Sequence, residues 1–213
     1  MKKTVITASI LSVLALHGAA IAAPMSSELK IKGKMAVPSC QVSVSNGGVF
    51  DLGKISNGLI DPNKTTPLTT GALVINAKCD AATYLSFTAE DNREGSSSTS
   101  GSTYFGLGSV NGTGKLGYYQ MKMYAAVVDH GGASRVYSTP KGSTTFSASQ
   151  DIMIDKNKVM GWAKGNNVQN GGKEFIAAID FMPVLASSRE MNGPLTESVK
   201  LDGSALLNFA YGL

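Results

Sequence analysis

The chain has 213 residues, a formal net charge of +4, only 16% charged residues and 24 glycines. Removing a leader that contains Lys2 and Lys3 lowers the charge to about +2, which argues against nucleic acid or an anionic membrane as the main partner. The many glycines and scarce charges are typical of an all-β chain with many turns, and the length suits one domain with a full core.

Residues 1–22 have the form of a secretory signal peptide. Lys2 and Lys3 precede an apolar run from Val5 to Leu16, which is too short to span a bilayer. Ala20-Ile21-Ala22 then offers small residues to signal peptidase. We therefore expect cleavage after Ala22 and an exported mature chain without a transmembrane segment.

Residues 28–40, with the sequence ELKIKGKMAVPSC, form the most informative stretch. Apolar residues occupy alternate positions, Gly33 stands in the same register, and the positions between them carry mainly lysine. Because a strand points alternate side chains to opposite faces, this segment should have one apolar and one basic face. The apolar positions are Leu29, Ile31, Met35 and Val37. An unpaired apolar strand is an aggregation hazard, so we expect it to pair with another molecule.

The alternation changes phase at Pro38. Before this residue the apolar side chains lie on odd-numbered positions, and from Cys40 to Val44 they lie on even-numbered ones. Proline lacks the amide donor that a sheet needs and favours strand ends. The phase change therefore predicts an N-terminal extension over residues 23–38 and a domain over residues 39–213.

The rest of the chain contains many short alternating segments separated by turns. This spacing of strands predicts a β-sandwich or a barrel, and the GSSSTSGST run over residues 95–103 predicts an exposed, flexible loop. Within residues 116–128, the odd-numbered side chains from Tyr119 to Val127 should share one face. The predicted strands cover residues 49–55, 73–79, 85–89, 116–128, 135–137, 144–146, 151–154, 159–163 and 175–181, and a last alternating segment runs from Val199 to Leu213.

Cys40 and Cys79 are the only cysteines. An even pair in an exported chain predicts a disulfide, whereas two thiols alone do not complete the tetrahedral shell of a metal site. Cys79 ends an alternating strand that should point it toward Cys40. We therefore expect a Cys40–Cys79 bond, which the chain-entropy model values at about 4 kcal/mol for a loop of this length.

No constellation of residues supports an enzyme. His130 follows Asp129 and precedes two glycines, as at a hairpin tip, and a catalytic triad needs a histidine brought beside a serine and a distant acid. Ser27 and Lys30 match the S-x-x-K pattern, but that chemistry needs a helix and the segment alternates as a strand. We expect no catalysis, no metal and no cofactor.

Two segments resemble chaperone–usher pilus subunits, which build bacterial fimbriae. GKMAVPSC over residues 33–40 resembles the N-terminal extension of that family, and LVINAKC over residues 73–79 resembles its second disulfide position. The likeness is strongest over residues 23–90. In addition, EDNR over 90–93 and FGLG over 105–108 resemble a sparsely characterised branch of fimbrial-like proteins.

The resemblance implies an immunoglobulin-like β-sandwich of the pilin type that is incomplete and is completed by a donor strand. It also implies a periplasmic pilus chaperone that first lends a strand, and an outer-membrane usher that exchanges it for the extension of the next pilus subunit. The donor strand would place Leu29, Ile31, Gly33, Met35 and Val37 in a neighbour's groove. Gly33 would then match a shallow pocket.

The same resemblance assigns chaperone or usher contacts to Phe209, Tyr211 and Leu213 at the C-terminus. The chain departs from the family pattern there, because Tyr211 is third from the end and Val199 stands where the family has a glycine. We therefore expect a structural subunit of a fimbrium, exported through the periplasm to the cell surface, which polymerises and supports adhesion. The alternative is a secreted or tip-located lectin-like adhesin.

Overall fold

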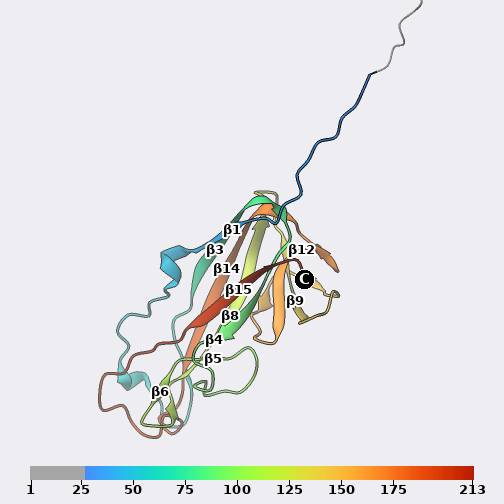
Figure 1. Ribbon diagram of the computed structural model, residues 1–213. Helices are drawn as coiled ribbons and strands as arrows, with labels where there is room; N and C mark the ends of the chain where they lie inside the picture. The colour runs from blue at the N-terminus through green and yellow to red at the C-terminus, as the bar shows by residue number, and fades with distance from the viewer. Residues whose placement is uncertain (1–26) are drawn as a thin grey trace, which may run out of the picture. The chain divides into compact units, whose positions relative to one another are not determined.

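The computed structural model describes residues 27–213, so the predicted signal peptide lies outside the described residues. Residues 27–36 and residues 37–213 belong to two separate units. The second unit is built from two antiparallel open sheets that face each other (Figure 1). This arrangement confirms the predicted all-β, immunoglobulin-like sandwich. Within residues 27–213, no helix has the length and apolarity that crossing a membrane requires.

The first sheet has the strand order β1-β3-β14-β8-β11, with β2 beside β14 and β5 beside β8. Its strand β1 lies at one edge and is bonded to β3 alone. The strands are β1 (Cys40–Val44), β2 (Thr66–Pro67), β3 (Gly71–Thr83), β5 (Phe105–Gly106), β8 (Gly117–Val128), β11 (Ile152–Met153) and β14 (Gly172–Leu185).

The second sheet has the order β10-β9-β12-β4-β15, with β13 beside β12, and the last strand of the chain lies at its edge. Its strands are β4 (Leu85–Asp91), β9 (Arg135–Pro140), β10 (Ala148–Ser149), β12 (Lys158–Gly165), β13 (Val168–Gln169) and β15 (Ala205–Tyr211). The remaining elements are the ribbon β6 (Ser109–Val110) with β7 (Gly114–Lys115), and the 3-10 turns η1 (Ser45–Gly48) and η2 (Asn57–Leu59).

Trp162 joins the two sheets at the centre of the core. Its indole lies edge-on to Phe87 of its own sheet and to Phe175 of the facing sheet, with ring centroids 6.2 and 5.4 Å apart. The indole N–H donates to the carbonyl of Ile176 at 2.9 Å. Aromatic side chains bury large areas and prefer such edge-to-face geometry, so this cluster stabilises the contact between the sheets.

The prediction of which side chains share one face of the long strand β8 is wrong in its second half. Tyr119, Met121 and Met123 face the core as expected, but Ala125 is exposed and has a φ of 48°. Opposite this residue the register with β14 shifts between Ile176 and Ala178, as at a β-bulge. The extra residue moves the later side chains to the other face, so the buried positions become Ala126 and Val128 instead of Ala125 and Val127.

The strands predicted over residues 49–55 and 144–146 are wrong, since neither segment carries strand pairing. In the first, the Asp51 carboxylate accepts the Gly53 N–H at 2.8 Å, and this local turn competes with a ladder. In the second, the Phe146 N–H donates at 2.6 Å to the side chain of Asn167. The loop over residues 95–103 is also less exposed than predicted, because Ser96 is buried and accepts the Gly108 N–H.

The predicted disulfide between Cys40 and Cys79 is confirmed. The two cysteines are direct partners in the β1–β3 ladder. Next to them, the Asp80 N–H donates to the Ser39 carbonyl at 3.0 Å, which makes the cysteines a pair without mutual backbone bonds. Such pairs have the closer side chains, and the two Cα atoms are 4.0 Å apart.

We expect the double substitution Cys40→Ser/Cys79→Ser to lower the free energy of unfolding by up to about 4 kcal/mol, because the unfolded chain regains loop entropy. The loop closed by the bond has a sequence separation of 39 residues. Urea unfolding of the oxidised chain and of the double variant measures the difference. Equal unfolding midpoints would contradict the expectation, and adding reductant to the double variant serves as the control.

Candidate functional site

The predicted donor segment has no strand partner in the described chain. Residues 27–39 carry no strand assignment, and the exposed fractions of Leu29, Ile31, Met35 and Val37 are 93%, 102%, 102% and 83%. A Cβ atom added at Gly33 would meet no atom within 4 Å. Contiguous exposed apolar side chains mark an interaction segment, and the role of these residues as donor positions remains a prediction.

A groove of about 400 Å³ opens between the edge strands β1 and β15. Its walls come from the two strands, and its floor comes from the core-facing side chains of β3, β8 and β14. The apolar side chains that line it include Val42, Val44, Leu73, Ile75, Tyr119, Met121, Ile179, Phe181, Ala205, Leu207 and Phe209. The groove is therefore a strip of sandwich core that residues 27–213 of the chain leave uncovered.

One wall of the groove is the free edge of β15. At its two ends, the Asn92 N–H donates to the Ser204 carbonyl and the Gly212 N–H donates to the Tyr84 carbonyl, both at 2.9 Å. Because backbone groups alternate along an antiparallel ladder, the even-numbered residues of β15 bond to β4. The odd-numbered ones, from Ala205 to Tyr211, point their N–H and carbonyl groups to the side where residues 27–213 supply no strand.

The opposite wall repeats this arrangement on β1. The Asp80 N–H donates to the Ser39 carbonyl, so the odd-numbered residues here point their backbone N–H and carbonyl groups toward β3. Cys40, Val42 and Val44 then direct their backbone groups toward the groove. An unpaired edge is a template for another strand, and two such edges over an apolar floor have the geometry that strand addition requires.

A row of aromatic rings crosses the floor of the groove. Phe50 stacks on Phe181 with centroids 5.6 Å apart, and Phe181 stacks on Tyr119 at 6.3 Å. Gly203 lies over this row, since a Cβ atom there would come within 2.8 Å of the Tyr119 ring. Burial raises the pKa of the Tyr119 hydroxyl, which keeps the floor uncharged. Gly203 therefore packs directly on the Tyr119 ring, at the place where the aromatic row reaches the start of β15.

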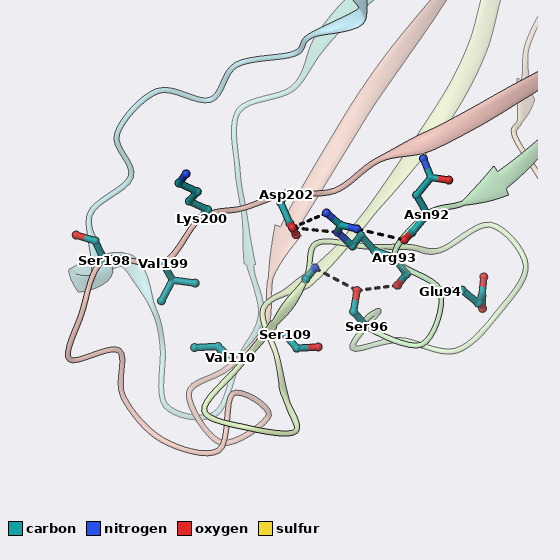
Figure 2. Close-up of a pocket in the computed structure, with 11 residues that line it drawn as sticks. Asn92, Arg93, Glu94, Ser96, Ser109, Val110, Ser198, Val199, Lys200 and Asp202 are labelled. Carbon is teal, nitrogen blue, oxygen red and sulfur yellow. Dashed lines mark hydrogen bonds and ion pairs between the residues drawn. The ribbon is translucent and has the colours of Figure 1, made fainter.

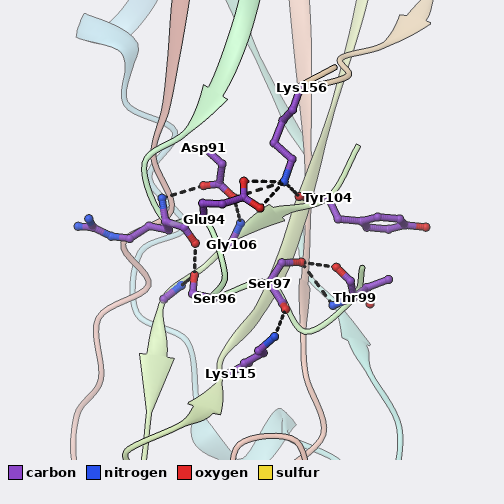
Figure 3. A network of polar contacts seen from close by, with 11 residues as sticks. Asp91, Glu94, Ser96, Ser97, Thr99, Tyr104, Gly106, Lys115 and Lys156 are labelled. Carbon is purple, nitrogen blue, oxygen red and sulfur yellow. Dashed lines mark hydrogen bonds and ion pairs between the residues drawn. The ribbon is translucent and has the colours of Figure 1, made fainter. Parts of the chain in front are cut away.

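Asp91, the last residue of β4, holds both ends of the loop that leads to β5, residues 92–104 (Figure 3). Its carboxylate accepts the Gly106 N–H at 2.8 Å and the Arg93 N–H at 2.9 Å, and the side chain is fully buried. Lys156 lies 4.0 Å from the same carboxylate and bonds to Glu94 at 2.9 Å. The lysine thus contacts one buried and one exposed carboxylate, and the network fixes the strand that carries Gly106 beneath the groove.

A second contact fixes the segment that leads into β15. The Arg93 guanidinium bonds to the Asp202 carboxylate at 2.7 and 3.0 Å (Figure 2), and this hydrogen bond raises the pKa of Arg93. The Asn92 side chain donates to the Ser204 hydroxyl at 2.8 Å. Asn92, Arg93 and Asp202 line a polar cavity of about 650 Å³, but the charge of its arginine is already neutralised by Asp202.

The predicted C-terminal contact residues lie at the other end of the groove. Phe209 is half-buried and packs on Phe87 with centroids 5.4 Å apart. The Tyr211 hydroxyl donates to the Pro38 carbonyl at 2.6 Å, and Leu213 is exposed. The end of β15 is thereby tied to Pro38, the residue at which the extension joins the domain, while the contacts of these residues with other proteins stay predictions.

His130 lies in the turn between β8 and β9, as predicted, and its ring pairs with the Glu174 carboxylate. Among residues 27–213 no group of three or more His, Cys, Asp or Glu side chains is placed to hold a metal ion. Sequence reasoning missed the groove residues Phe50, Phe181 and Gly203. Alternation marks a side chain as inward, but it does not tell which inward face stays uncovered.

Residues 29–108 match the family described as "Protein of unknown function (DUF1120)". The chain is also similar to Protein GltF of Escherichia coli (strain K12), with 30% identity over 164 residues that cover 73% of this chain and 58% of GltF. It therefore spans less than two thirds of the length of that relative. The range matched by the family, residues 29–108, contains the predicted donor positions, both cysteines and Asp91.

We expect Asp91→Ala to lower the free energy of unfolding by about 1–3 kcal/mol, because it leaves the buried Gly106 N–H without its acceptor and removes the buried one of the two carboxylates beside Lys156. The control is Glu94→Ala, which removes the other carboxylate that contacts Lys156. The Glu94 side chain is 69% exposed, so its loss should cost less than about 1 kcal/mol. Urea unfolding compares the two variants, and equal losses would contradict the assigned role of the buried carboxylate.

Proposed function

We propose that this protein is a structural subunit of a bacterial fimbrium that polymerises by donor-strand exchange and supports adhesion at the cell surface. In this reaction residues 29–37 of one copy fill the groove between β1 and β15 of the next. One observation carries the proposal: the chain contains both an apolar groove with two free strand edges and an exposed, alternating segment. The segment has the length and the side chains of the missing strand.

The direction of the donor strand follows from where the extension joins the domain. Pro38 is bonded to Tyr211 at one end of the groove. A donor running parallel to β15 would leave the groove at this end, where the acceptor's own extension starts. An antiparallel donor leaves at the Gly203 end instead. Each subunit then donates at one end and accepts at the other, and such head-to-tail contacts build an open filament.

The register of the donor strand follows from the aromatic row. Gly33 has no side chain, so we place it above the bulky rings of Phe181 and Tyr119, beside Ala205. From Leu29 to Val37 an extended chain covers about 26 Å, which is longer than β15. In this register Leu29 and Ile31 lie beside Phe209 and Leu207, and Met35 and Val37 lie beside Gly203 and Leu201.

A subunit with an open groove needs a temporary cover before it polymerises. Its free edges and apolar floor favour non-specific pairing with other chains. The proposed partners are therefore a periplasmic pilus chaperone that occupies the groove, an outer-membrane usher where the exchange takes place, and other pilus subunits. Phe209, Tyr211 and Leu213, at the end of the free edge, are the proposed chaperone contacts.

The register is tested with labelled peptides of residues 27–38 and a full-length acceptor whose own extension is disabled by Ile31→Asp. We expect the Gly33→Leu peptide to bind roughly 10- to 100-fold more weakly than the unchanged peptide, because overpacking costs about 1–3 kcal/mol. Fluorescence anisotropy measures the affinities. The Ala36→Leu peptide, altered on the opposite face, is the control and should bind about as well as the unchanged peptide. Equal affinity of the Gly33→Leu peptide would sink the register.

Polymerisation is tested with the mature chain produced in a bacterium that exports it together with its chaperone and usher. We expect ladders of polymers in unheated detergent gels and fibres in electron micrographs, because an inserted strand joins the core of its neighbour. Ile31→Asp should abolish both, since it places a charge in the groove without an ion partner. A chain that stays monomeric, or an unchanged ladder from Ile31→Asp, would refute strand exchange through this segment.

A further inference from the structure

A second cavity, of about 1160 Å³, continues the groove beyond the start of β15. It lies between two irregular segments, residues 48–57 and residues 195–204. The cavity and the groove share Phe50, Leu52, Leu201 and Gly203 in their linings, so they form one continuous depression. We refer to it as the end cavity.

The donor strand of a neighbouring copy does not fill the end cavity. In the register proposed above, Val37 lies beside Leu201, at the border between groove and cavity. The part lined by Ile60, Leu195 and Val199 extends further. In this register residues 29–37 therefore leave these apolar side chains uncovered.

The spacer between donor strand and donor domain is very short. Only Pro38 and Ser39 separate Val37 from Cys40, and Cys40 is fixed in β1 and by its disulfide. Three Cα–Cα steps reach at most about 11 Å. The domain of the donor copy therefore begins directly at the end cavity of the acceptor and must lie against it.

The donor domain presents exposed apolar side chains where the spacer begins. Tyr84, Tyr211 and Leu213 are each about half exposed. They are neighbours, because the Gly212 N–H donates to the Tyr84 carbonyl at 2.9 Å and the Tyr211 hydroxyl bonds to Pro38. We call these residues the root patch. Tyrosines of this kind are frequent anchors in protein interfaces.

We propose that consecutive copies of this chain make a second contact, in which the root patch of the donor closes the end cavity of the acceptor. The occupant is a second copy of the same chain, and the inference rests on the strand exchange proposed above. The contact restricts the angle between neighbouring domains and adds buried apolar area next to the inserted strand. It thereby slows dissociation of the polymer without changing how the strand itself binds.

The test separates the strand from the end contact. Val199→Asp alters the end cavity of the acceptor, and Val199 does not line the groove. We expect this variant, tested with Ile31→Asp as acceptor, to bind the peptide of residues 27–38 as well as its parent. Polymers of Val199→Asp chains, in contrast, should dissociate at least about 10-fold faster in warm detergent. The matched control is Val74→Asp, at an exposed valine on β3, which should leave the dissociation rate unchanged.

The donor side is tested separately with Tyr84→Asp, which should accelerate dissociation to a similar extent. Combining Val199→Asp with Tyr84→Lys should restore part of the lost stability, because the two substituted charges attract across the contact. Urea unfolding of each monomer shows that the domain is intact.

If the peptide binds and polymers form but all variants dissociate at the parent rate, the end contact is refuted and strand exchange stands. If only Val199→Asp has an effect, something other than the root patch occupies the cavity. If the unchanged peptide does not bind, the proposed function itself fails.

Discussion

Two facing strand edges over an apolar floor are the constraint on which the described structure depends. The edges belong to β1 and β15, which lie in different sheets and are each paired on one side only among residues 27–213. Apolar floor residues such as Ile179 and Met121 are well buried, yet they line an open groove because no strand lies above them. The free energy available from covering this floor and pairing both edges is what favours the proposed uptake of an additional strand.

The rest of the sandwich holds these edges in place while the groove is open. At one end the Cys40–Cys79 bond ties β1 to β3, and the Tyr211 hydroxyl ties β15 to Pro38. At the other end Arg93 and Asp202 fix the segment that leads into β15. Restraints at both ends keep the groove ordered before binding. They therefore reduce the entropy that the acceptor would lose when a strand binds. A rigid groove cannot adjust to a larger side chain, so a single glycine can determine the proposed register.

Much of the fold was accessible from alternation alone. The shared inward face of Tyr119, Met121 and Met123 was predicted correctly, because a strand points every second side chain to the same face. Alternation failed where a local bond displaced the ladder. The bulge at Ala125 reversed the faces of β8, and the turn at Asp51 prevented a strand next to it. Neither event leaves a signal in the hydrophobic pattern.

Local sequence patterns were enough to predict the all-β class, the disulfide and an alternating apolar segment with a glycine in its register. These follow from local chemistry: the period of apolar residues, an even number of cysteines and a proline that breaks the phase. It took the tertiary structure to reveal that β1 and β15 face each other with no strand between them among residues 27–213, and that Phe50, Phe181 and Tyr119 form an aromatic row near Gly203. Both features depend on contacts between residues far apart in the chain, which no local pattern encodes.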